Sequence, residues 1–275
     1  MKYRYQPLFW IAIVGGVYLS LMYINPYNGV IPLSDAILQL SGSRGVFVLG
    51  FSFTELVPFA MRLLPEFIIE LYAGIMLYQN FCTASVYIFS RYPHRAKWYL
   101  GEAGRLGGTV CILNMLLLAV TILTTAVRYE IQTDSAGVML LLYHFAIHSL
   151  WMYAMTLLVN LLALYLGSST AYAVVVSAQM ICIVLLNLMD LLVRHLDGRL
   201  TYENAVIWNP IAHLVLGWHD RHVENIDPAY APYDILMDLN DSLIIFFLVG
   251  VVLTSAGVFI IKKHDLLVSD LETEV

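Results

Sequence analysis

Long apolar stretches recur along this chain, and six of them reach the length of a membrane-spanning helix. A helix needs about 20 predominantly apolar residues to cross a bilayer. Most charged residues fall in the segments between these stretches. The pattern predicts an all-α, polytopic membrane protein that forms a single transmembrane domain over residues 1–275. We place its six transmembrane helices at residues 8–24, 66–89, 107–127, 138–166, 171–193 and 242–261.

A seventh apolar stretch, Gly45–Met61, contains Glu55 and Pro58. A charge at the centre of a spanning helix costs several kcal/mol, so a full crossing is disfavoured. We expect an interfacial or re-entrant outer helix here. The two longest segments between spans, residues 25–65 and 194–241, then lie on the outer side of the membrane.

The composition indicates that a bilayer surrounds most of this protein. Of its 275 residues, 60% are apolar and 12% are charged, whereas soluble domains contain about 45–50% apolar and about 25% charged residues. The net charge of −6 comes without a basic run, so we expect no nucleic-acid partner. Membrane lipid is the expected surrounding. This composition excludes a disordered tail, a nucleic-acid module and an ordinary cytosolic enzyme.

The distribution of lysine predicts the orientation of the spans. Segments on the cytoplasmic side of membrane proteins carry an excess of Lys and Arg. With six spans and a cytoplasmic N-terminus, every lysine falls on the inner side, namely Lys2, Lys97, Lys262 and Lys263. We therefore expect both termini in the cytoplasm.

The most basic segment, residues 90–106, follows the second predicted span. It reads SRYPHRAKWYLGEAGRL, with four basic residues and one acid. Pro93 should end the preceding helix, because a proline ring removes a helical hydrogen bond. A short helix can restart at His94 and lie along the membrane face. Its basic residues either only set the topology or form a docking surface for a cytosolic protein.

The same region resembles the membrane subunits of bacterial type-2 ABC exporters. The shared pattern is Tyr-x-Phe-Ser/Thr-Arg-Tyr-x-x-Arg-x-x-Trp, here Tyr87, Phe89, Ser90, Arg91, Tyr92, Arg95 and Trp98. A second point of similarity is Trp208–Asn209–Pro210–Ile211, in the outer segment before the last span. The resemblance implies six spans, a cytosolic coupling helix between spans two and three, and short outer helices before span six.

The resemblance also implies a function, that of the permease in an ATP-driven exporter of the bacterial cytoplasmic (inner) membrane. No G-x-x-x-x-G-K-[ST] loop occurs in this chain, so ATP and Mg²⁺ would bind a separate cytosolic ABC ATPase subunit. The chain would pair with a second permease copy, as a homodimer or a related heterodimer, and move a peptide, lipid or drug-like substrate by alternating access. The ATPase would contact the coupling loop at Arg91, Tyr92, Pro93, His94, Arg95, Lys97 and Trp98.

Polar residues within the spans are candidates for a translocation path. Such groups are costly in hydrocarbon and usually face the interior of a helix bundle, where they can also simply join helices. Both roles remain open for Asn114, His144, His148, Asn160, Gln179, Asn187 and Asp190. In the outer segment, Trp208, Asn209 and Pro210 form either an outer gate or a lid over helix ends.

A polytopic membrane enzyme is the alternative, using either a histidine-bound metal or paired carboxylates. His144 and His148 share one helical face and could meet His213, His219 or His222 of the outer segment. No histidine or glutamate follows at the spacing of a known zinc motif, so we expect no metal.

The paired carboxylates of that alternative are Glu66 and Glu70, which also lie four residues apart. They stand where the second span is expected to enter the membrane. We expect them to meet water or Arg62 there, and we assign no catalytic residue.

Overall fold

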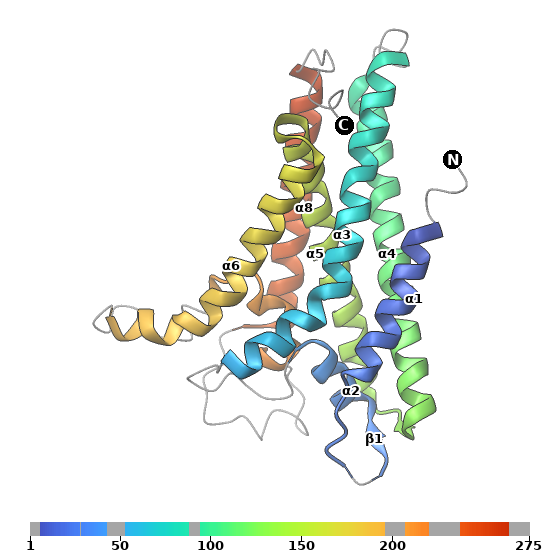
Figure 1. Ribbon diagram of the computed structural model, residues 1–275, viewed down its shortest axis with the longest axis vertical. Coiled ribbons are helices and arrows are strands. Elements are labelled where there is room, and N and C mark those ends of the chain that lie inside the picture. The colour runs from blue at the N-terminus through green and yellow to red at the C-terminus, as the bar shows by residue number, and fades with distance from the viewer. Residues whose placement is uncertain are drawn as a thin grey trace.

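The computed structural model describes residues 6–27, 29–42, 53–87, 94–195, 207–219 and 237–263. Within these ranges the chain is mainly helical, and the long helices run along the longest axis of the molecule (Figure 1). The helices are α1 (Gln6–Leu21), α2 (Leu33–Leu40), α3 (Phe53–Tyr87), α4 (Arg95–Arg128), α5 (Ser135–Leu166), α6 (Ser168–His195) and α8 (Leu239–Lys263).

Four of these helices are long and apolar enough to cross a membrane. They are α4, α5, the Ser168–Leu186 part of α6, and α8 over Leu239–Lys262. Helix α1 is apolar but has 16 residues, and α3 carries several charges in its first half. These two helices correspond to the first and second predicted spans.

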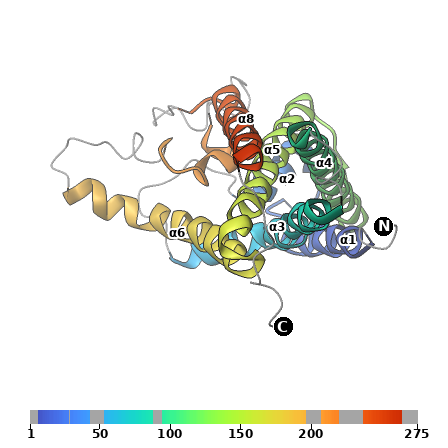
Figure 2. The ribbon, with the colours of Figure 1, turned by 90° about the horizontal axis from the view of Figure 1, so that it is seen from above.

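Helix α5 lies at the centre of the bundle. It contacts α2, α3, α4, α6 and α8, and Figure 2 shows the other long helices around it. Helices α1 and α4 pack together on one side, and α6 diverges from the bundle on the other. The largest apolar cluster surrounds α5 and includes Leu140, Ile147 and Val159, none of which is exposed. Polar side chains on α5 are therefore enclosed by neighbouring helices.

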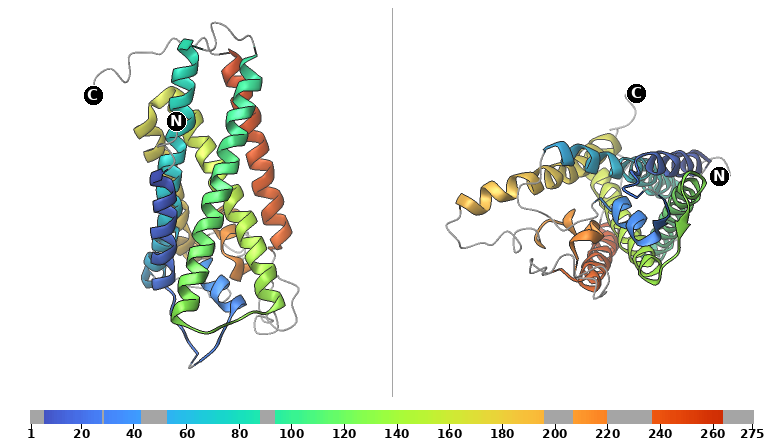
Figure 3. Two further views of the ribbon diagram at one scale, coloured as in Figure 1. Left: turned by 90° about the vertical axis from the view of Figure 1, so that its right-hand side faces the viewer. Right: turned by 90° about the horizontal axis from the view of Figure 1, so that it is seen from below.

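A short parallel strand pair joins two connections at one end of the bundle. Strand β1 (Ile31–Pro32) pairs with β2 (Ile131–Gln132), and α2 follows β1 and packs on α5 beneath the bundle (Figure 3). Asp134 fixes this end, because its carboxylate accepts the N–H of Gly137 in α5 and that of Ser34 in α2.

Residues 53–61 of the predicted interfacial or re-entrant helix are helical, but they are continuous with the second predicted span rather than returning to the outer side. These residues are the first turns of α3, which continues to Tyr87 through Pro58 and Pro65. The reason is an apolar stripe at helical spacing, formed by Leu56, Phe59 and Leu63, that is buried in the main core. Burial of this stripe outweighs the hydrogen bonds that the two prolines remove. Residues 45–52 lie outside the described part of the chain.

The prediction of a separate short helix along the membrane face is wrong. Helix α4 begins at Arg95 and runs unbroken to Arg128. No proline interrupts it, and a glycine inside a helix costs only about 1 kcal/mol relative to alanine. Tyr99, Ala103 and Leu106 form a buried stripe that continues at Val110. The basic residues of the first turn are thus rigidly joined to a potential spanning helix.

Candidate functional site

Buried polar side chains from four helices gather in the interior of the bundle. None of them is more than 6% exposed: Glu66 and Glu70 on α3, Asn114 on α4, His144 and His148 on α5, and Gln179 on α6. The expectation that the two glutamates meet water or Arg62 is wrong. Helix α3 starts at Phe53, so both carboxyl groups lie well inside it, and the Arg62 guanidinium donates to the carbonyl of Gly42 instead.

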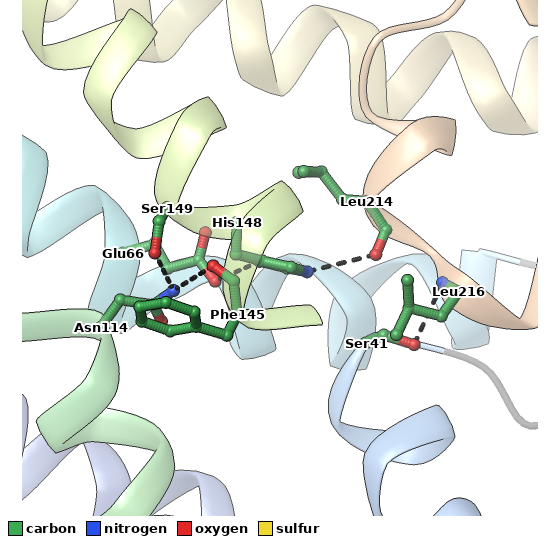
Figure 4. Close-up of polar contacts among 8 residues, drawn as sticks. All are labelled: Ser41, Glu66, Asn114, Phe145, His148, Ser149, Leu214 and Leu216. Carbon is green, nitrogen blue, oxygen red and sulfur yellow. Dashed lines mark hydrogen bonds and ion pairs between the residues drawn. The ribbon is translucent and has the colours of Figure 1, made fainter. Parts of the chain in front are cut away.

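Glu66 and His148 form the centre of this polar cluster (Figure 4). His148 Nδ1 lies 2.7 Å from Glu66 Oε1, and His148 Nε2 lies 3.2 Å from the carbonyl oxygen of Leu214. A carbonyl oxygen can only accept, so Nε2 carries a proton and donates it to Leu214. One further proton lies between Nδ1 and the carboxyl group. The pair is neutral overall, whichever partner holds that proton.

Glu70 and Gln179 form a second buried contact, between α3 and α6. The Gln179 amide nitrogen donates to Glu70 Oε2 at 2.8 Å. The other two oxygens of this contact, Glu70 Oε1 and Gln179 Oε1, are buried and have no hydrogen-bond partner. Buried polar atoms without partners are rare in folded proteins and require an explanation.

His144 and Asn114 extend the cluster toward α4. The His144 ring lies against His148 with 3.9 Å between ring centroids, and its Nδ1 is buried without a partner. Asn114 donates to Ser149 Oγ at 2.9 Å and to the carbonyl oxygen of Phe145 at 3.2 Å (Figure 4). The cluster therefore joins the central helix to α3 on one side and to α4 on another.

Asn160 joins α5 to α3. Its side-chain oxygen accepts the backbone N–H of Tyr78 in α3, and its amide nitrogen donates to the carbonyl oxygen of Thr156, both at 2.7 Å. Asn187 and Asp190 lie in α6, and their side chains fall outside the described part of the structure.

The segment 207–219 packs into the bundle beside α6 and α8. It contains two short 3₁₀ turns, Ala212–Leu214 and Leu216–Trp218, and its residues from 211 to 219 are buried. Asn209 anchors it, because its amide nitrogen donates to the carbonyl oxygen of Cys182 at 2.7 Å and its side-chain oxygen accepts the N–H of Ile211. Trp208 is 82% exposed and Pro210 is half-buried. The three predicted gate residues thus differ in their surroundings: Asn209 holds the segment against α6, whereas most of the Trp208 side chain is exposed.

Two histidines attach this segment to the last helix. His213 Nδ1 and His219 Nε2 each lie 2.7 Å from the hydroxyl oxygen of Ser242, the fourth residue of α8. Burial lowers the pKa of His213, against the opposing effects of the Ile207 carbonyl and of Asp241. His144 and His148 do not join these residues, and no group of three or more His, Cys, Asp and Glu in the described ranges could hold a metal ion. His222 lies outside those ranges.

The predicted docking residues lie at one end of the bundle, in the first turn of α4. His94, Arg95 and Lys97 line a shallow hollow together with Lys262 at the end of α8. Trp98 is half-buried and packs on the apolar cluster around Tyr99. The remaining predicted docking residues, Arg91, Tyr92 and Pro93, are outside the described residues.

The four long apolar helices define the class of this protein, a multi-pass membrane protein. Comparison with known proteins adds no family, because no family model, no curated protein and no solved structure matches the chain.

The sequence identified His144, His148, Asn114 and Gln179 as candidate site residues. The surroundings predicted for Glu66 and Glu70 were wrong. The signal for their burial was the apolar stripe of residues 56–63, which extends the helix ahead of them. Nothing in the sequence could identify the carbonyl oxygen of Leu214 as a partner of His148, because every residue has a carbonyl group.

Proposed function

We propose that this chain is the permease subunit of an ATP-driven exporter of the type-2 ABC class. The proposal rests on the resemblance of residues 87–98 and 208–211 to such subunits. In this proposal the chain spans a bacterial cytoplasmic membrane six times and pairs with a second permease copy. A separate cytosolic ATPase binds ATP and Mg²⁺.

Helix α4 departs from the short coupling helix that the resemblance implies, but its unbroken course would still connect a docked ATPase to the bundle. Its basic first turn, at Arg95 and Lys97, belongs to the same 34-residue helix as the apolar stretch that ends at Arg128. At about 1.5 Å per residue such a helix is about 50 Å long. An ATPase docked on the first turn would therefore move the far end of the helix as one rigid body, which is what alternating access requires.

The helix ends that the proposal makes cytoplasmic lie together at one end of the bundle. The start of α1, the first turn of α4 and the end of α8 all lie in the upper half of Figure 1, whereas the segment 207–219 lies in the lower half. Docking surface and outer gate would then be on opposite sides of the membrane.

Charge reversal at the first turn of α4 tests the docking. The Arg95→Glu/Lys97→Glu variant should insert normally but lose the ATPase subunit during affinity purification from the native host. The matched control is Gln132→Glu/Thr133→Glu, which adds two acids at exposed positions of the opposite end. A complex that survives the first variant, or a wild-type protein that never retains an ATPase, would refute the proposal.

Cysteine labelling tests the orientation separately. In a background without Cys82, Cys111 and Cys182, a membrane-impermeant maleimide should label Thr133→Cys in intact cells. Ala96→Cys should react only after lysis. Labelling of Ala96→Cys from outside would reverse the topology and exclude cytosolic docking at α4.

The buried Glu66–His148 pair favours a second candidate, a polytopic membrane enzyme, because such pairs transfer protons in acid–base catalysis. The exporter proposal expects no stoichiometric transition metal and only a modest loss of activity in His144→Gln/His148→Gln. Elemental analysis tests a metal-dependent form of this enzyme, and the activity of the double variant tests the acid–base form. Stoichiometric zinc or iron that disappears in this double variant, together with all activity, would favour the enzyme.

A further inference from the structure

The contact between Glu70 and Gln179 is satisfied in only one protonation state. If Glu70 is ionised, both of its oxygens and Gln179 Oε1 can only accept hydrogen bonds. No donor then reaches the two oxygens that lack partners, Glu70 Oε1 and Gln179 Oε1. If Glu70 carries a proton, the carboxylic acid has one donor and one acceptor, and the amide of Gln179 offers an N–H donor and an oxygen acceptor to match them. Acid and amide are then complementary, and the bond from the Gln179 amide nitrogen to Glu70 Oε2 is the half already made.

The surrounding helices give Glu70 no positive partner within the described residues. On its own helix Glu66 repels a charge on Glu70. From α5, His148 is hydrogen-bonded to Glu66, and the ring of His144 lies against that of His148. From α6, the hydroxyl of Tyr172 donates to the carbonyl oxygen of Phe67.

The other helices that contact α3 do not supply a charge either. Helix α1 (Gln6–Leu21) has no charged residue. The charged residues of α4 lie in its first eleven positions or at its last, Arg128. Glu70 is itself 0% exposed, so water does not solvate a charge there. An unpaired buried charge is strongly unfavourable, and such a group usually becomes neutral instead.

We propose that Glu70 is a proton-binding site of the bundle, occupied while α3 and α6 are packed together and emptied when they separate. The bound proton supplies the missing donor of the Glu70–Gln179 contact and removes the buried charge. On separation the O–H bond of Glu70 breaks, the proton passes to entering water, and the carboxylate remains hydrated. A ligand that binds one state shifts the equilibrium toward that state, so proton binding favours the packed arrangement. This inference is independent of the ATPase partner and of the transported substrate.

Infrared difference spectroscopy on the purified full-length protein in detergent tests the bound proton. The spectrum of the wild type minus Glu70→Gln at neutral pH should contain the carbonyl stretch of a protonated carboxylic acid, shifted in D₂O. Gln179→Leu should retain that band at a higher frequency, because the acid has lost its amide partner. A spectrum that shows only the loss of carboxylate bands would overturn the proposal. A stability that depends on Na⁺ rather than on pH, with the acid band absent, would also overturn it and indicate a cation site.

Spin labels on α3 and α6 test the coupling to helix movement. Tyr72→Cys and Val174→Cys are suitable positions, because the side chains are 47% and 46% exposed. Raising the pH should broaden the distance distribution between the labels in the wild type but not in Glu70→Gln, whose amide is neutral at every pH and can still pair with Gln179. An equal response to pH in both proteins would show that another group is responsible and would refute the proposal.

Discussion

Glu66 and His148 are 82 residues apart in the chain, yet Glu66 Oε1 and His148 Nδ1 lie 2.7 Å apart inside the bundle. Through its second nitrogen, His148 also binds the carbonyl oxygen of Leu214. One side chain of the central helix thus joins α3 to the segment 207–219. Any movement of that segment away from α5 breaks the second hydrogen bond.

Removal of one partner of this pair should be much more costly than removal of both. Glu66→Leu leaves His148 Nδ1 buried and unpaired, and an unsatisfied buried polar group of this kind costs about 1–3 kcal/mol. Glu66→Leu/His148→Leu removes both polar groups and should recover most of that loss. Unfolding of the single and double variants in mixed detergent–SDS micelles measures the difference. Strictly additive losses would show that the two side chains do not interact.

The stability of the segment 207–219 should depend on pH through His213. Because burial lowers the pKa of His213, the unfolded chain binds a proton there at higher pH than the folded protein does. The stabilising contribution is therefore complete above the ordinary histidine pKa of about 6.5 and is lost as the pH falls below it.

Thermal unfolding at about pH 8 and about pH 5.5 measures this effect, since the two values lie on either side of the ordinary histidine pKa. The wild type should lose more stability on acidification than His213→Gln, which cannot titrate. His94→Gln is a matched control, because His94 lies in an exposed position outside the segment. If His213→Gln and the wild type respond alike, His213 is not the titrating group.

Contact between α1 and α4 should depend on the absence of a side chain at Gly16. A Cβ atom there would lie 2.8 Å from both the carbonyl oxygen of Leu117 and Cβ of Val120. Since a helix backbone cannot yield as a side chain does, Gly16→Ala should cost about 1–3 kcal/mol.

The matched control for Gly16→Ala is Gly108→Ala. Gly108 lies in α4 with no neighbouring atom within 4 Å of the added Cβ, so alanine should stabilise the helix by up to about 1 kcal/mol. Opposite shifts of the thermal midpoint are expected for the two variants. A shift in the same direction would mean that α1 and α4 do not approach closely at Gly16.

Asp134 should stabilise two helices at once. Its carboxylate accepts the N–H of Gly137 and that of Ser34, each at 3.1 Å. Asp134→Ala removes both bonds and should cost about 1–2 kcal/mol, the usual effect of losing a helix cap. Asp134→Asn keeps one acceptor oxygen and should be intermediate. Limited proteolysis near residues 25–42 measures how far α2 loosens. Unchanged cleavage in Asp134→Ala would argue against the hydrogen bond from the Ser34 N–H to Asp134.

The apolar helices were predictable from sequence because their signal is local. A run such as residues 242–261 must be helical in a bilayer wherever it packs, since its backbone groups have no other partners there. The buried faces of α5 followed from the same logic, and the predictions that His144, His148, Asn114 and Gln179 are buried are confirmed.

The predicted starts of helices agreed less well with the structure, because local sequence signals and packing against distant residues oppose each other there. Pro58 and Glu55 predicted a break before the second span, but the stripe of Leu56, Phe59 and Leu63 packs on the central helix and keeps α3 continuous. At the start of α4 the basic residues predicted a surface helix. Burial of Tyr99 favours one long helix instead. The outcome depends on packing against distant parts of the chain.

The partners of the polar side chains were decided by tertiary structure alone. The i, i+4 spacing of Glu66 and Glu70 placed them on one face of α3, as it placed His144 and His148 on one face of α5. The spacing could not show that Gln179, 109 residues beyond Glu70, would meet that carboxyl group. Hydrophobic periodicity tells which face of a helix is buried, but it does not tell which two buried faces meet. Only the packed bundle decides that, and with it which polar atoms are left without partners.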